Sequence, residues 1–116
     1  MDSILTSIKK LLGIAEDYDH FDDDIVIYIN TVFLDLTQLG IGPANGFTIE
    51  DDSATWSDFL PDTHSLFEAA KSYVYLKVRL LFDPPLSSTV MDAINRNINE
   101  LTFRLNVAAE STTEST

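Results

Sequence analysis

The chain has 116 residues, 45% of them apolar, which predicts one domain with a core of ordinary size. It has no cysteine, so disulfide bonds, thiolate catalysis and cysteine-ligated zinc are excluded. Its net charge of −12, with only seven Lys and Arg residues, argues against a protein that wraps nucleic acid, because phosphate binding needs clustered cations.

Residues 1–13 lack the basic start, the continuous apolar centre and the small-residue cleavage site of a secretory signal. No apolar run approaches the roughly 20 residues that a membrane span requires. We therefore expect a protein that stays inside the producing cell and has no membrane partner.

Two helices are predicted in the first third of the chain, where apolar residues recur every three or four positions. The first covers about residues 2–12, with Ser3 as its N-cap and Gly13 at its C-terminal end. The second covers about residues 23–39. It begins at three consecutive aspartates, which the positive end of a helix dipole favours.

The next segment, residues 41–64, combines turn-forming glycine and proline with scattered apolar residues. A loop of about 24 residues inside a compact domain is unusual and is often functional. We expect it to hold a short strand at residues 47–49 or a helical turn near Trp56.

Two further helices are predicted at about residues 65–82 and 87–106, with Ser87 or Ser88 capping the second. The two prolines between them stop the first helix and predict an antiparallel helical hairpin. The fold class is therefore all-α, a small bundle of about four helices over residues 1–106. Residues 107–116 are polar and are predicted to form a flexible tail.

Six of the nine residues from 16 to 24 are acidic, which suggests calcium binding. An EF-hand loop that started at Asp17 would place Phe21 and Tyr28 at ligand positions, and neither supplies a carboxylate. His20 and His64 lack the convergent partners of a metal site, and no nucleophile elbow, phosphate loop or dinucleotide fingerprint occurs. We expect no enzyme activity, no metal and no cofactor.

Two groups of apolar residues each have two possible interpretations: those in the loop, and those that lie outside the main apolar face of a helix. Trp56, the only tryptophan, is either an anchor for a partner or a residue that packs the loop onto its own core. Surplus apolar residues either contact other subunits or complete the core; they are Val26, Tyr28, Phe33, Phe67, Tyr75 and Leu76.

Several segments together resemble the head-tail connector, or adaptor, proteins of tailed bacteriophages. The matching segments are ILTSIKKLLGI, DDDIVIYINTVFLDLTQLGIGP, FTIEDDSATWSDFL, EAAKSYVYLKVRLLFDPP and VMDAINRNINELTFRLNV. This resemblance implies a structural virion protein that forms a ring, commonly of twelve subunits, below the portal. The ring extends the DNA channel and offers a platform for a stopper or tail-completion protein.

The partners implied are copies of the chain itself, the portal protein, the stopper or tail-completion protein, and genomic DNA that passes without specific binding. The implied location is the neck of the virion, and the host cytoplasm before assembly. The acidic segments are expected at the channel or its rim, and the C-terminal segment at the portal. An alternative is an acidic regulatory protein that mimics DNA charge and binds a basic partner.

These expectations select three sets of residues. The candidate subunit or partner interface comprises Phe47, Ile49, Trp56, Phe59, Phe67 and Tyr75. The candidate acidic channel or rim comprises Asp17, Asp19, Asp22, Asp23, Asp24, Glu50, Asp51 and Asp52. The candidate portal-docking tail comprises Leu105, Asn106, Val107, Ala108, Ala109 and Glu110.

Overall fold

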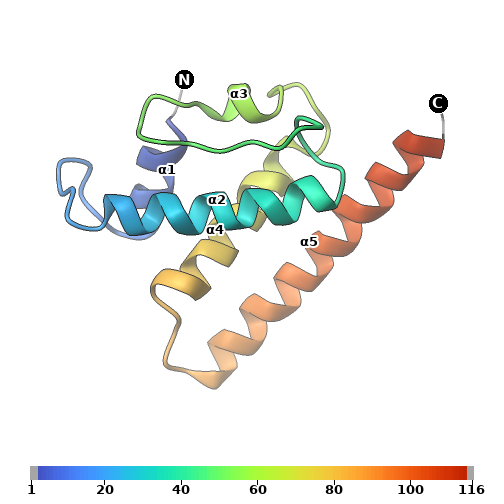
Figure 1. Ribbon diagram of the computed structural model, residues 1–116. Helices are drawn as coiled ribbons and strands as arrows, with labels where there is room; N and C mark the ends of the chain where they lie inside the picture. The colour runs from blue at the N-terminus through green and yellow to red at the C-terminus, as the bar shows by residue number, and fades with distance from the viewer. Residues whose placement is uncertain (1–2, 115–116) are drawn as a thin grey trace.

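The computed structural model describes residues 3–114, and the side chains of residues 3–107, as an assembly of five helices (Figure 1). The helices are α1 (Ile4–Leu11), α2 (Asp22–Gln38), α3 (Trp56–Phe59), α4 (Phe67–Phe82) and α5 (Ser88–Glu114). The described residues form no β-strand. The prediction of an all-α fold is confirmed, and α3 is the helical turn expected near Trp56.

The helix ends follow local rules that the sequence makes visible. The Ser3 hydroxyl accepts the backbone N–H of Thr6 at 3.2 Å, which confirms the predicted N-cap of α1. Gly13 follows α1 with a φ of 81°, a left-handed conformation that glycine adopts without strain. At the start of α5, the Ser87 hydroxyl accepts the N–H of Val90 at 3.4 Å.

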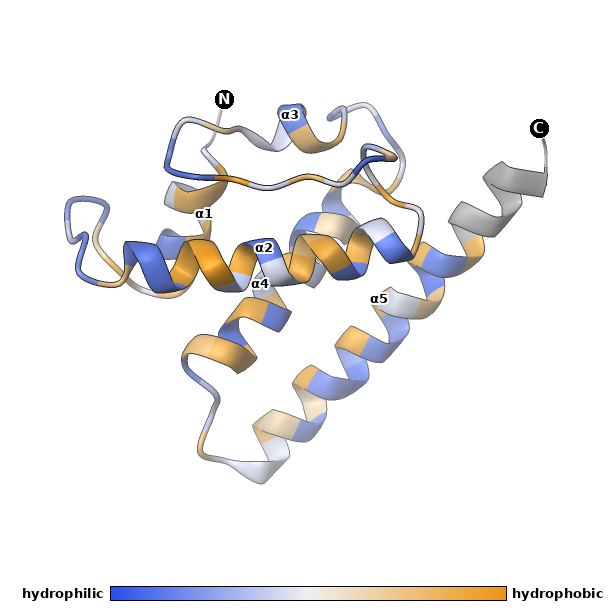
Figure 2. Ribbon diagram, viewed as in Figure 1, coloured by the Kyte–Doolittle hydropathy of each residue, from blue (hydrophilic) through white to orange (hydrophobic). Residues whose placement is uncertain are grey.

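α2 is the centre of the fold, and both α1 and α4 pack against it. Its buried side chains form a continuous stripe, and the ribbon is hydrophobic along most of its length after a hydrophilic first turn (Figure 2). The stripe consists of Ile25, Ile29, Val32, Phe33 and Leu36. Burial of an apolar side chain of this size contributes about 1.5–3 kcal/mol, so this stripe makes a large contribution to stability.

The loop between α2 and α3 contains no strand at residues 47–49, although one was possible from the sequence. Asn30 of α2 takes the place of a partner strand. Its side chain accepts the N–H of Ile49 at 2.8 Å and donates to the carbonyl of Ile49 at 3.0 Å. Both backbone groups are therefore satisfied without strand pairing.

The second half of this loop is attached to α1. The N–H of Ile4 donates to the carbonyl of Ala54 at 2.9 Å, and Ser3 forms an isolated bridge with Thr55. The indole N–H of Trp56 donates to the Ser7 hydroxyl at 2.8 Å. The loop is thus a lid that covers the bundle (Figure 1).

α4 and α5 run in opposite senses from the turn at the two prolines, as a hairpin requires (Figure 1). α5 continues to Glu114, whereas the sequence predicted an end at residue 106. Residues 107–114 contain no Gly or Pro to stop the helix, and they include the good helix formers Ala and Glu. The flexibility of residues 107–116 stays a prediction, and residues 115–116 lie outside the described residues.

Candidate functional site

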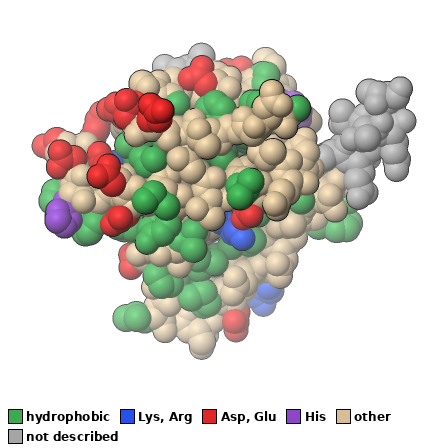
Figure 3. Space-filling model, viewed as in Figure 1, with side chains coloured by type: hydrophobic (Ala, Val, Ile, Leu, Met, Phe, Trp, Pro, Cys, Tyr) green, Lys and Arg blue, Asp and Glu red, His purple; other side chains and the backbone are tan. Residues whose placement is uncertain are grey.

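Seven exposed carboxylates from two separate segments lie at one end of the molecule. Figure 3 shows acidic side chains gathered where the α1–α2 loop, the first turn of α2 and the adjacent bend of the α2–α3 loop meet. The exposed acidic candidates that these segments contain are Asp17, Asp19, Asp23, Asp24, Glu50, Asp51 and Asp52. We call this set the acidic end, and it brings together two candidate segments that are about 30 residues apart in sequence.

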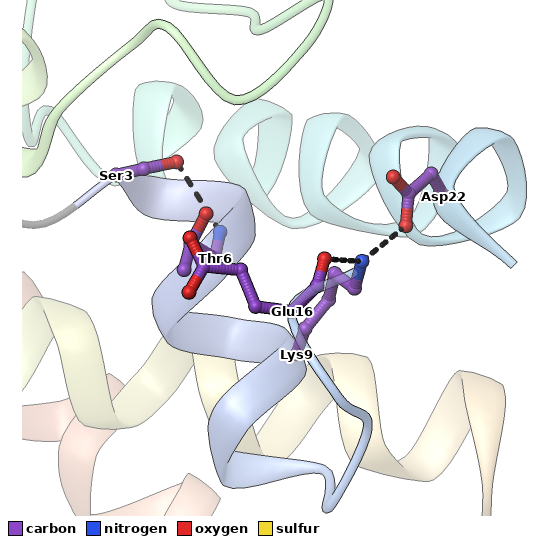
Figure 4. Close-up of polar contacts among 5 residues, drawn as sticks. All are labelled: Ser3, Thr6, Lys9, Glu16 and Asp22. Carbon is purple, nitrogen blue, oxygen red and sulfur yellow. Dashed lines mark hydrogen bonds and ion pairs between the residues drawn. The ribbon is translucent and has the colours of Figure 1, made fainter. Parts of the chain in front are cut away.

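Asp22 differs from the other candidate acids because it is bound to a buried lysine. The Lys9 ammonium lies 2.8 Å from the Asp22 carboxylate and donates to the carbonyl of Glu16 at 3.0 Å (Figure 4). The Lys9 side chain is only 3% exposed. Together, this ion pair and hydrogen bond join α1, the α1–α2 loop and the start of α2. Asp22 therefore has a structural role within the chain.

The burial of Lys9 was not predicted from the sequence. A signal was present, because Lys9 follows the buried Leu5 by four residues and therefore lies on the apolar face of α1. A lysine in that position, followed by many acids, is a candidate for an internal ion pair.

Among the described acidic residues, Asp51 is the one whose pKa is clearly shifted. It accepts hydrogen bonds from the hydroxyl and the backbone N–H of Ser53. These bonds favour the charged form and hold the pKa of Asp51 below its usual value of 3.8. The loop around Glu50 and Asp52 is thus ordered by a carboxylate that stays ionised.

The apolar candidates for an interface divide into core and surface residues. Ile49, Trp56 and Phe59 are buried in the chain's own core. Phe47 is half-buried, with its ring 5.3 Å from that of Phe33. Phe67 and Tyr75 of α4 are also half-buried, so in this fold they are among the candidates that reach the surface.

The candidate portal-docking tail also divides. Leu105 is fully buried and fixes α5 to the core, whereas Asn106 and Val107 are exposed. The side chains of Ala108, Ala109 and Glu110 lie outside the described residues. Among the described side chains of this tail, Asn106 and Val107 are therefore the ones that a partner can contact.

Neither histidine belongs to a cluster of metal-binding side chains in the part of the chain that the structure describes. His20 packs edge-on against Phe21 with ring centroids 4.9 Å apart, and the His64 ring accepts the N–H of Leu66 at 3.0 Å. Among the residues that the structure describes, no three His, Cys, Asp or Glu side chains are placed to hold a metal ion.

The family model described as phage connector protein matches residues 4–112, nearly the whole chain. The chain belongs to the phage connector family. No curated protein and no solved structure matches it. Family membership gives this connector a structural role at the junction of head and tail in a bacteriophage virion, where it assembles with other virion proteins.

Two exposed apolar residues of the connector were missed by sequence reasoning. Ile27 and Leu34 of α2 are 60% and 58% exposed. They lie on the side of the helix opposite its buried stripe, since each residue turns an α-helix by about 100°. Of the surplus residues expected on this helix, Val26 and Tyr28 are half-buried, and Phe33 is fully buried and completes the core.

None of the described helices has the length and apolar character to cross a membrane.

Proposed function

We propose that the connector is one subunit of a ring, commonly of twelve copies, that lies below the portal and extends the DNA channel. The ring carries a platform for a stopper or tail-completion protein. The acidic end is the observation that supports this proposal most directly. Repeated around a ring, its seven exposed carboxylates per subunit form a negatively charged surface.

A negatively charged surface suits a conduit because DNA carries one negative charge for about every 1.7 Å of its axis. Carboxylates within a Debye length of the phosphates, about 8 Å at physiological salt, repel them and prevent adhesion. We therefore assign the acidic end to the channel or its rim, where DNA passes without specific binding.

The C-terminal part of α5 is proposed to contact the portal. Leu105 holds the helix in the core, and the exposed residues Asn106 and Val107 start the segment that projects from it. The half-buried Phe67 and Tyr75 are proposed to lie near a neighbouring subunit. Because these surfaces are on different elements, one subunit is able to meet several partners at once.

Native mass spectrometry of the connector with the purified portal of the same phage tests this proposal. The expected result is a portal complex that carries many copies of the connector. A stable one-to-one complex with a basic nuclease or repressor, and no binding to the portal, would favour the DNA-mimic alternative. A map of the assembled ring with the acidic end on the outer wall would overturn the assignment to the channel.

A further inference from the structure

A groove runs along one side of α4, between that helix and α1. It consists of two adjoining pockets of about 400 and 250 Å³ that share Leu11 and Tyr75 as walls. From Glu68 to Asp83 it follows α4 for about 22 Å, at a rise of about 1.5 Å per residue. No residue of α2 lines either pocket, and α4 passes behind α2 in the view of Figure 1.

The groove carries a net positive charge although the protein is strongly acidic, because three cations outnumber the two carboxylates that also line it, Glu68 and Asp83. Lys10 and Lys71 line its larger pocket, and Arg79 lines the smaller one. Three other basic side chains are neutralised in ion pairs: Lys9, Lys77 and Arg104. The groove therefore holds three of the four described Lys and Arg side chains that have no ion-pair partner within the described chain.

The larger pocket has a mostly apolar floor, whereas the surface of the smaller pocket is more polar than apolar. Leu11 is 57% exposed there, beside Trp56 and Tyr75. An apolar floor with cations along it matches an amphipathic helix that presents aliphatic side chains together with carboxylates. The occupant is therefore expected to be helical and acidic.

The outward face of α2 has this chemistry. It presents Ile27 and Leu34, spaced seven residues apart, and the exposed carboxylates of Asp23 and Asp24 lie at its start. The helix contains four aspartates and neither Lys nor Arg. From Asp23 to Gln38 this face is about 22 Å long, which equals the length of the groove.

We propose that the α1–α4 groove of one connector subunit receives the outward face of α2 from the next subunit. This inference rests on the proposed ring and identifies its subunit contact. The two surfaces are on opposite sides of α2, because Ile27 and Leu34 point away from the helices that form the groove. Such a head-to-tail contact leaves one free groove and one free α2 face after each addition, and it closes into a ring when the rotation permits.

Two variants test the contact by complementation. Leu34→Asp places a charge at the centre of the outward face of α2, and Lys10→Glu with Arg79→Glu reverses the charge of the groove. Leu34 and Lys10 are exposed and Arg79 is half-buried at the groove, so circular dichroism is measured first and is expected to match the wild type. Native mass spectrometry with the portal should show that neither variant alone forms a ring.

An equimolar mixture of the two variants is expected to form a one-to-one heterodimer and nothing larger, because only one intact groove and one intact α2 face can meet. Leu86→Asp, at a fully exposed leucine in the hairpin turn, is the matched control and should keep the ring.

The outcomes separate this inference from the ring itself. If the wild type forms rings and either variant does so equally well, the groove contact is wrong and the ring proposal stands. If both variants lose the ring but their mixture gives no heterodimer, the two surfaces do not meet and the contact is wrong. If the wild type forms no ring with the portal, the proposed function fails, and the contact fails with it.

Discussion

Lys9 shows how one residue helps to fix the path of residues 9–22. Its ammonium reaches the Asp22 carboxylate and the Glu16 carbonyl, so a single side chain closes the α1–α2 loop (Figure 4). A buried charge is costly unless it is paired and hydrogen-bonded, and here both conditions are met. The burial of this lysine therefore depends on the acidic residues that follow it.

Lys9→Ala is expected to destabilise the fold by about 3 kcal/mol, because it leaves Asp22 without its cation and removes a buried aliphatic stem. Urea unfolding followed by circular dichroism measures the change. Lys10→Ala, at the exposed neighbouring position, is the control and should change stability by less than about 0.5 kcal/mol. Equal midpoints for the two variants would contradict the structural role of Lys9.

Asp51 provides a prediction about pH. Hydrogen bonds from Ser53 lower the pKa of its carboxyl, so they favour the folded loop above the unfolded pKa of 3.8, and this contribution is lost as the pH falls through the lowered pKa. Ser53→Ala should raise the pKa of Asp51 toward 3.8. Carboxyl NMR titration of both proteins measures the shift, and an unchanged pKa in the variant would refute the assignment.

At the scale of elements, the lid formed by the α2–α3 loop depends on a close approach at Gly42. Its φ is 88°, and a Cβ there would clash with the ring of Phe59. Phe59 is buried against Phe33 of α2, with ring centroids 4.6 Å apart. The glycine therefore allows the start of the lid to lie directly on α3.

Gly42→Ala is expected to destabilise the protein by about 2 kcal/mol or more, from left-handed strain plus the clash with Phe59. Gly13→Ala is a matched control, since its φ of 81° imposes similar strain but nothing lies within 4 Å of the added Cβ. The control should cost about 1 kcal/mol. Thermal unfolding compares them, and equal losses would mean that the contact with Phe59 is unimportant.

The helices were predictable because their signals are local. Ser3, Gly13 and the prolines after Asp83 mark helix ends through backbone chemistry that acts within a few residues. The pairing of Asn30 with Ile49 was not predictable, since it joins residues 19 apart through a side chain. The late end of α5 was missed because a polar composition resembles that of a disordered tail.

The candidate site was predicted in part for the same reason. The acidic segments are visible as runs of one charge, but only the folded chain brings the α1–α2 loop and the bend of the α2–α3 loop to one end (Figure 3). Ile27 and Leu34 were hidden because α2 is apolar on nearly all sides, so periodicity alone did not reveal which residues remain exposed. Sequence therefore indicated the charge and the helices, and folding determined which surfaces are available.

At the scale of the whole molecule, positive and negative charges are separated. The acidic end collects seven exposed carboxylates, and the α1–α4 groove collects three cations beside two carboxylates. Head-to-tail stacking through the groove would bury these cations against Asp23 and Asp24 of the next subunit and leave the other five carboxylates of the acidic end at the surface. An assembled ring would then be more uniformly negative than its isolated subunits, which suits contact with passing DNA.

Reversing the charge of part of the acidic end should make DNA adhere to the ring. Asp17→Lys with Asp19→Lys places two cations per subunit at the proposed channel, so measurable binding of double-stranded DNA is expected at low salt, with the effect disappearing as salt screens the phosphates. The control is Asp62→Lys with Asp92→Lys, which makes the same charge change at exposed positions outside the acidic end. Fluorescence anisotropy of labelled DNA measures binding, and equal effects of both pairs would place the channel elsewhere.

Trp56 gives the connector an internal optical reporter. It is the only tryptophan, its indole N–H is bound to Ser7 of α1, and it lies at the floor of the groove beside Lys71. Its emission should shift to the red when the lid leaves α1 during unfolding, and to the blue when a neighbouring subunit excludes water from the groove. Folding and assembly of this chain can therefore be followed separately in one unlabelled sample.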